Sequence, residues 1–185
     1  MYKKICVTNR KLVNGELEDK IEEIFQSFDV DILILREKDL PEKQFTDLAD
    51  KILKICKNYG VNLYINTYYE IAKKLNIKNI ALPLQVAQKV DDFSFFDNII
   101  ISIHSKDEII EAENLGATAL MYGNIFETSC KIGKAGVGVD SLNEIVNLSK
   151  LPIYAIGGIV DEEQEKLILS KGAKGIAKMS TYMKI

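Results

Sequence analysis

Tryptophan is absent from this chain, and histidine occurs only once, as His104. A metal site made of three histidines is therefore excluded, and acid–base chemistry has to use this histidine, a carboxylate, a lysine, a tyrosine or a cysteine. The three cysteines, Cys6, Cys56 and Cys130, are scattered along the chain. They form neither a disulfide framework nor a paired-cysteine metal motif, so we expect a reduced, cytoplasmic protein.

Long apolar runs and an excess of positive charge are also lacking. The apolar runs contain six residues or fewer, and no stretch at the start has the length of a signal-peptide core. The 24 basic and 27 acidic residues give a net charge of −3, so we expect neither nucleic acid nor a membrane as a partner. The 185 residues, 47% of them apolar, predict a single domain over residues 1–185.

Short apolar segments alternate with helical ones. The apolar segments are typical of strands buried on both faces, and the others repeat apolar residues every three or four positions. This alternation favours parallel strands and a closed α/β barrel, the (β/α)8 TIM barrel, over the alternative of an open doubly wound sheet. The expected strands are Lys3–Thr8, Asp31–Glu37, Asn62–Asn66, Asn79–Pro83, Asn98–His104, Ala119–Phe126, Pro152–Gly157 and Gly175–Ser180, and the expected helices are Leu17–Phe28, Pro41–Tyr59, Glu108–Leu115, Ser141–Leu148 and Asp161–Leu169.

The predicted barrel is a short form that lacks the last helix. The chain ends a few residues after the eighth strand, and the segment 84–97 holds at most a degenerate helix. One outer flank is then uncovered, so either a second subunit, as in a homodimer, or polar residues must shield it. Lys178 in the eighth strand either faces solvent on this flank or points into the barrel mouth.

Chemistry in such a barrel takes place at the carboxyl ends of the strands. After the seventh strand, Gly157 and Gly158 can present backbone N–H groups to an anion, and Asp161 is a candidate N-cap of the following helix. Ser180, after the eighth strand, adds a hydroxyl group. These residues predict a phosphate site, although paired glycines are also typical of tight turns.

Cationic and amide side chains end the second and third strands. Arg36 and Lys38 alternate with Glu37, so both cations project to one face. There they suit a phosphate or carboxylate ligand, and a solvated strand end is the alternative. Asn66 can bind a ligand or cap the next helix.

The fifth and sixth strands complete the predicted rim. Ser102 and His104 share a face, and the lone histidine is either a hydrogen-bonded structural residue or a catalyst. A glycine-rich loop follows the sixth strand and is typical of loops that close over ligands. This loop carries Lys131, which can reach a phosphate, and Cys130, which has no partner base in the sequence and is expected to be inert.

Together these stretches resemble the thiamin phosphate synthase/TenI family over nearly the whole chain, from Ile5 to Thr181. The synthases of that family join a hydroxymethylpyrimidine diphosphate to a thiazole phosphate and release diphosphate, using magnesium. The stretches that carry the resemblance are Leu35–Lys38, Ile65–Asn66, Ser102–Ser105, Gly123–Lys131, Ala155–Ile159 and Ala177–Ser180.

The resemblance also implies roles for single residues. The phosphate of the thiazole or of the product is expected at Gly157, Gly158 and Ser180. Thr128 is expected to line the thiazole pocket, together with Ser102 and Asn124 as substrate-binding residues. The residues implied on the diphosphate side are Arg36, Lys38, Asn66 and Lys131.

The departures from the family concern its metal site. The synthases have an aspartate directly after the strand-three asparagine, where this chain has Thr67, and another after strand four, where the run 81–86 has no carboxylate. Ile34 replaces a glutamine before the strand-two arginine. Magnesium needs oxygen ligands, usually with one or two carboxylates. We therefore expect no metal and no other cofactor.

The stretches Leu82-Pro83 and Phe126–Thr128 look more like the TenI branch, which includes a thiazole phosphate tautomerase. The acid–base histidine of that tautomerase corresponds to Asn124, and an amide cannot carry a proton. The candidates to replace it as catalytic residues are His104, Glu127 and Lys38. The expected function is a TenI-like protein of thiamin biosynthesis that binds thiazole phosphate or thiamin phosphate. The alternatives are a synthase with an altered site and a non-catalytic phosphate-binding regulator.

Overall fold

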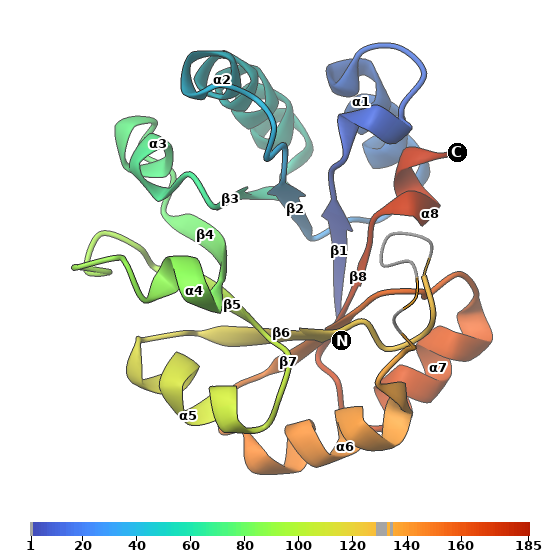
Figure 1. Ribbon diagram of the computed structural model, residues 1–185. Coiled ribbons are helices and arrows are strands. Elements are labelled where there is room, and N and C mark those ends of the chain that lie inside the picture. Colours follow the sequence, from blue (N-terminus) through green and yellow to red (C-terminus); the bar gives the residue numbers. More distant parts are fainter. Residues whose placement is uncertain (1, 129–132, 134) are drawn as a thin grey trace.

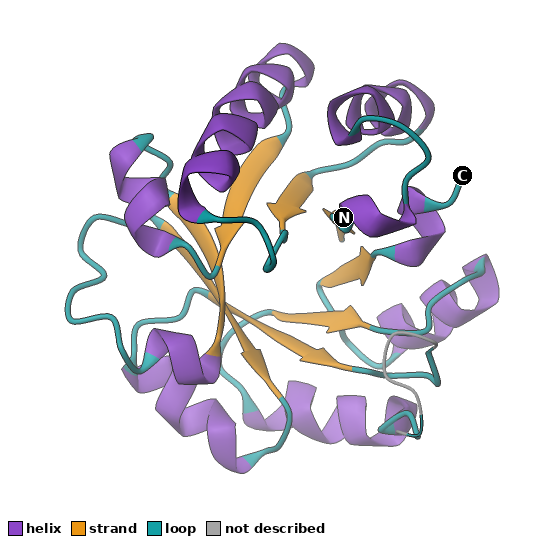
Figure 2. Cartoon of the chain, turned by 45° about the horizontal axis from the view of Figure 1, so that its top comes forward, coloured by secondary structure: helices purple, strands orange, loops and turns teal. Residues whose placement is uncertain are grey.

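The computed structural model describes residues 2–128, 133 and 135–185 and shows a closed barrel of eight parallel strands (Figures 1 and 2). Each strand pairs with the next, and β1 pairs with β8 from Lys3 opposite Gly175 to Cys6 opposite Lys178. This closure confirms the predicted (β/α)8 barrel over an open sheet. The strands are β1 Lys3–Val7, β2 Ile32–Leu35, β3 Asn62–Asn66, β4 Asn79–Pro83, β5 Asn98–Ile103, β6 Ala119–Gly123, β7 Ile153–Ile156 and β8 Gly175–Lys178.

Helices surround the barrel on the outside (Figure 2). A 3-10 turn, η1, spans Arg10–Leu12. The α-helices are α1 Leu17–Ser27, α2 Glu42–Tyr59, α3 Tyr69–Lys74, α4 Leu84–Ala87, α5 Asp107–Asn114, α6 Gly138–Leu148, α7 Glu162–Ser170 and α8 Ser180–Met183. No helix in the described ranges has both the length and the apolar character needed to cross a membrane.

Two helices differ from the sequence-based expectation. The sequence predicts no helix at α3, whose six residues bury only Ile71 and Ala72 and so give little periodicity. The sequence also predicts that the last helix is missing. This prediction is wrong, because the one-turn helix α8 forms there and buries Tyr182 and Met183. The single turn of α4 agrees with the degenerate helix expected there.

The helix ends follow the expected capping signals. Asp161 is the N-cap of α7, and its Oδ1 accepts a hydrogen bond from the backbone N–H of Gln164 at 2.8 Å. Gly60 ends α2 in the left-handed conformation with φ 70°. Pro41 lies one position before its predicted place, as the N-cap of α2.

The barrel has an inner and an outer apolar layer. The outer layer packs strands against helices through side chains such as Leu33, Phe45 and Ile52. Side chains along a strand point alternately into and out of the barrel. At the carboxyl end of each strand, the next inward-facing residues therefore point into the barrel mouth. The inner layer contains Ile5, Val7, Ile32, Ile34, Tyr64, Ala81, Ile100, Ala119, Met121 and Ala177.

The flank between α1 and α7 is covered by the short α8 (Figure 1). Tyr182 of α8 packs edge-on against Phe28, with ring centroids 5.5 Å apart. Lys178 points outward from β8 and forms an ion pair with Glu165 of α7, and its side chain is only 12% exposed. The solvent-facing interpretation is therefore wrong, because the half-buried lysine packs against α7. Lys178 is also among the residues that line the cavity at the barrel mouth.

Candidate functional site

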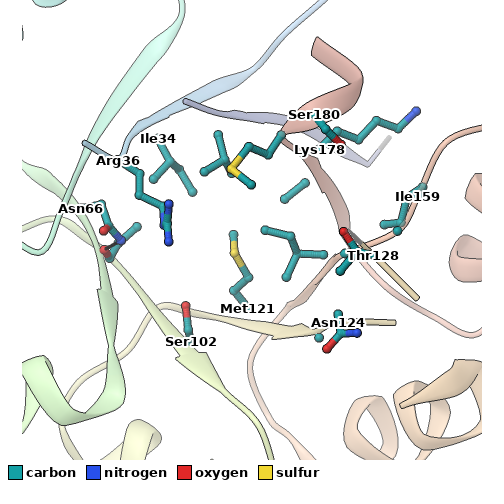
Figure 3. A pocket seen from close by; sticks show the side chains of 18 of the residues that line it. Ile34, Arg36, Asn66, Ser102, Met121, Asn124, Thr128, Ile159, Lys178 and Ser180 are labelled. Atoms are coloured by element: carbon teal, nitrogen blue, oxygen red, sulfur yellow. Dashed lines mark hydrogen bonds between the residues drawn. The ribbon is translucent and has the colours of Figure 1, made fainter. Parts of the chain in front are cut away.

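A cavity of about 510 Å³ opens at the carboxyl ends of the barrel strands (Figure 3). It brings together all the sequence-predicted site residues except Lys131, which lies outside the described residues with Cys130. The roles of these residues stay predictions, but the structure places them around one space. The predicted residues that line it are Arg36, Lys38, Asn66, Ser102, His104, Asn124, Glu127, Thr128, Gly157, Gly158 and Ser180.

The floor of the cavity is apolar, and it is not among the residues predicted for the site. Ile34 and Met121 continue the inner barrel layer into the cavity (Figure 3). The period-two alternation along β2 and β6 could have identified both residues. The other lining residues not predicted include Val7, Ala81, Gln85, Ile156, Val160, Ala177, Met179 and Thr181.

Two cations line one side of the cavity. The side chain of Arg36 points into the space beside Asn66 (Figure 3), and its backbone N–H donates to Thr8 Oγ1 at 2.9 Å. Burial and the neighbouring charge of Arg36 lower the pKa of Lys38. Among the described residues, no carboxylate forms an ion pair with Arg36 or Lys38. The two side chains therefore leave positive charge available to a ligand.

The residues at the expected metal positions do not fit magnesium. Thr67 donates its hydroxyl to Asn66 Oδ1 at 2.9 Å, and Asn66 Nδ2 donates to Ala81 O at 2.7 Å. Asn66 thus ties β3 to β4 and does not cap α3, whose N-cap makes no side-chain hydrogen bond. Glu127, which is exposed, is the one carboxylate in the described cavity lining. No cluster of three or more potential ligands exists in the part of the chain that the structure describes.

His104 is anchored at the mouth by the last residue of β6. Its Nδ1 lies 3.0 Å from the carbonyl oxygen of Gly123. A carbonyl only accepts hydrogen bonds, so Nδ1 carries the proton and Nε2 is the free basic nitrogen of the neutral ring. The backbone N–H of His104 donates to Glu108 Oε2 at 2.6 Å. In this geometry Nδ1 of His104 makes a structural hydrogen bond, and Nε2 remains for proton transfer.

Gly157 and Gly158 are constrained by their own chain. Both have positive φ angles, 103° and 70°. A Cβ atom on Gly158 would lie 2.5 Å from the carbonyl oxygen of Glu127 and 2.7 Å from Phe126 Cβ. The backbone N–H of Phe126 also donates to Gly157 O at 3.0 Å. Close packing against the loop after β6 therefore explains these glycines without a ligand.

The expected anion site nevertheless has suitable donors. The structure shows no hydrogen bond from the N–H of Gly157 or Gly158 to any described group. Ser180 is half-buried at the start of α8 and lines the same cavity (Figure 3). Thr181 is less available, because its hydroxyl donates to Ile159 O at 3.1 Å.

Comparisons with known proteins agree with the fold. A profile of the family described as thiamine monophosphate synthase matches residues 5–182. The chain is 36% identical to the thiamine-phosphate synthase of Clostridium acetobutylicum, over 97% of this chain and 86% of that protein. It is 30% identical to the putative thiamine-phosphate synthase 2 of Aquifex aeolicus, over 96% of both chains. The solved structure of thiamine phosphate pyrophosphorylase from Pyrococcus furiosus has the same fold, with a TM-score of 0.84 over 100% of this chain and 88% of that one, at 23% identity.

Proposed function

Because the chain belongs to the thiamine monophosphate synthase family, we propose that its cavity binds a thiazole phosphate and joins it to a hydroxymethylpyrimidine diphosphate. The products are thiamin phosphate and diphosphate. The observation that carries this proposal is the unpaired cationic wall of Arg36 and Lys38 in a cavity with an apolar floor. This assignment favours the synthase over the TenI-like function expected from the sequence.

The coupling reaction requires charge stabilisation more than proton transfer. The bond between the pyrimidine methylene carbon and the diphosphate oxygen breaks, and its electron pair leaves with the diphosphate. The thiazole nitrogen supplies the electron pair of the new carbon–nitrogen bond, so atoms and charges balance without an added acid or base. Arg36 and Lys38 both line the cavity, and in the proposed complex they stabilise the departing anion.

The two ends of the cavity suit two anionic groups. The cationic pair of Arg36 and Lys38 faces the diphosphate. Across the cavity, the N–H groups of Gly157 and Gly158 with the Ser180 hydroxyl face the thiazole phosphate. Ile34 and Met121 pack against the apolar rings between them. No metal ion is part of the proposal, because the described cavity lining offers a single exposed carboxylate, Glu127, as a metal ligand.

A second candidate function is the tautomerase reaction on a thiazole carboxylate phosphate. His104 favours it, because the hydrogen bond to Gly123 O leaves Nε2 as a base at the cavity mouth. This reaction needs a proton acceptor and no diphosphate site. It therefore depends on His104 and not on Arg36, which separates it from the coupling reaction.

The deciding experiment measures thiamin phosphate by chromatography after incubation with both substrates, with EDTA and with magnesium. We expect product in both buffers, a loss of about a hundredfold or more in Arg36→Met, and less than a threefold change in His104→Gln. Lys51→Met removes a distant surface cation paired with Glu18 and serves as the charge control. Absence of product from wild type in both buffers would overturn the proposal. Tautomerase turnover that is lost in His104→Gln would establish the second candidate in its place.

A further inference from the structure

The segment after β2 alternates cations with carboxylates, in the order Arg36, Glu37, Lys38 and Asp39. The two cations line the cavity, but neither carboxylate does. Both carboxylates are bound by Arg10 of η1. This arrangement is unexpected for four adjacent charges, because each cation has an acidic neighbour with which it could form an ion pair.

Arg10 contacts Asp39 through both ends of its guanidinium group. Nη1 donates to Asp39 Oδ1 at 2.6 Å, and Nη2 donates to Asp39 Oδ2 at 2.9 Å. Lys11 adds a third contact, with Nζ 3.0 Å from Asp39 Oδ2. Hydrogen bonds from Arg10 and Lys11 lower the pKa of Asp39, so this carboxylate stays ionised.

Glu37 is bound by the same arginine and is almost fully buried, at 2% exposure. Nη1 of Arg10 donates to Glu37 Oε2 at 3.2 Å, and the backbone N–H of Arg10 donates to Oε1 at 3.0 Å. Thr8 Oγ1 donates to Glu37 Oε1 at 2.7 Å and accepts from the backbone N–H of Arg36. This network fixes the backbone at Arg36 with the Glu37 side chain turned away from the cavity.

The electrostatic environment of Lys38 agrees with this separation. Burial lowers its pKa first, followed by the positive charge of Arg36. A carboxylate beside Lys38 would act in the opposite direction, since it favours the charged form. The two cavity cations therefore repel each other, and neither forms an ion pair with a carboxylate among the described residues.

We propose that Arg10 is a positioning residue of the cavity: by holding Glu37 and Asp39 it keeps Arg36 and Lys38 unpaired for an anionic ligand. The inference rests on the proposed function, because that function needs these two cations at the diphosphate. Arg10 itself does not line the cavity. Without Arg10, the exposed Asp39 would be free to turn toward Lys38 or Arg36 and compete with the ligand for them.

Calorimetric titration with inorganic diphosphate in EDTA tests this role. We expect Arg10→Met to bind diphosphate about tenfold more weakly than wild type. Asp39→Asn alone should change the affinity by less than threefold, because Arg10 already holds that carboxylate. In the double variant Arg10→Met/Asp39→Asn, the affinity should return to within about threefold of wild type. Lys51→Met controls for net charge, because its partner Glu18 lies away from the cavity.

If Arg10 only stabilised the fold, Asp39→Asn would not restore the diphosphate affinity that is lost in Arg10→Met. Wild-type affinity in Arg10→Met, or a double variant as weak as Arg10→Met, would therefore overturn the inference. The inference would also be overturned if Asp39→Asn raised the diphosphate affinity by the same factor in wild type and in Arg10→Met, since that result would reflect net charge alone. A wild-type protein that does not bind diphosphate would overturn the proposed function itself.

Arg10→Met destabilises the fold, since it leaves the buried carboxylate of Glu37 without its ion-pair partner. A second pair of variants covers the case of an unfolded Arg10→Met. In that case Arg10→Lys and the double variant Arg10→Lys/Asp39→Asn are compared instead. Lysine keeps a charge for Glu37 but cannot bind Asp39 through two nitrogens. We expect about threefold weaker binding in Arg10→Lys and recovery with Asp39→Asn. Wild-type affinity in a folded Arg10→Lys would overturn the inference.

Discussion

A Cβ atom on Gly157 would lie 2.5 Å from the Cβ atom of Asn124, so the loops after β6 and β7 touch through a glycine. The contact holds the rim of the cavity together on the side where the thiazole phosphate is proposed to bind. Gly157 is thus required by the fold, whether or not its N–H binds a ligand.

Replacing Gly157 by alanine therefore tests packing, and Gly15 provides the matched control. Gly15 has a similar φ of 111°, but a Cβ atom there would meet nothing within 4 Å. We expect Gly15→Ala to lower the free energy of unfolding by about 1–2 kcal/mol through backbone strain alone. Gly157→Ala should cost at least about 2 kcal/mol more, because the added methyl group overpacks the loop. Equal urea midpoints for the two variants would show that the contact with Asn124 is unimportant.

The lowered pKa of Lys38 predicts a pH dependence of anion binding. Below its pKa the ammonium group binds the anion, and above it the charge is lost. Because partial desolvation and Arg36 lower this pKa below the ordinary value of 10.5, the affinity should begin to fall at a lower pH than for a lysine with the ordinary pKa. A bound anion raises the pKa again, so binding takes up a proton in this range.

Titration of diphosphate against wild type and Lys38→Met, from pH 7 upward, measures this effect. The ligand titrates too, but its contribution is the same for both proteins and cancels in the ratio of their affinities. We expect the advantage of wild type to shrink as the pH rises. A ratio that stays constant up to pH 10.5 would show that Lys38 does not bind the anion in its charged form.

The buried thiols should be unreactive in the folded protein. Burial raises the pKa of Cys6, and it raises the pKa of Cys56 to about 12. The reactive thiolate is therefore scarce at pH 8, and both sulfur atoms lie in the core. Peptide mapping after alkylation should find Cys6 and Cys56 unmodified in the native protein and modified in urea. Fast native modification of either residue would contradict this burial.

The short α8 should contribute to stability through Tyr182. This residue is 8% exposed, and its ring packs against Phe28 on the flank between α1 and α7. We expect Tyr182→Ala to lower the free energy of unfolding by about 3 kcal/mol. The control Leu148→Ala, at a residue 58% exposed on α6, should change it by less than about 0.5 kcal/mol. Similar losses in both variants would show that α8 does not cover the flank.

Much of the barrel could be predicted from the sequence, because buried parallel strands are continuous apolar runs. Ile32–Leu35 is buried at all four positions, and its pattern has no other simple explanation. The helix α3 has no comparable signal, since its stability comes from contacts with β3 and β4 rather than from its own periodicity. The turn of α8 likewise depends on Phe28, which is 154 residues away from Tyr182 in the chain, since 182 − 28 = 154.

The part of the candidate site formed by side chains at the strand ends could be predicted from the sequence. The alternation in Arg36–Lys38 correctly predicts two cations on one side of the cavity. The partner of Lys178 was not predictable, since Glu165 lies on another element and only the three-dimensional packing brings them together. The binding of Glu37 and Asp39 by Arg10 was missed for the same reason: it joins segments that are 27 and 29 residues apart.

A crystal structure with thiamin phosphate bound is the most direct test of the central claim. We expect the phosphate group within hydrogen-bonding distance of the Gly158 N–H and the Ser180 hydroxyl, with the pyrimidine end toward Arg36 and no cation between them. Density for the phosphate elsewhere, or for a metal ion held by protein carboxylates at the mouth, would contradict the account.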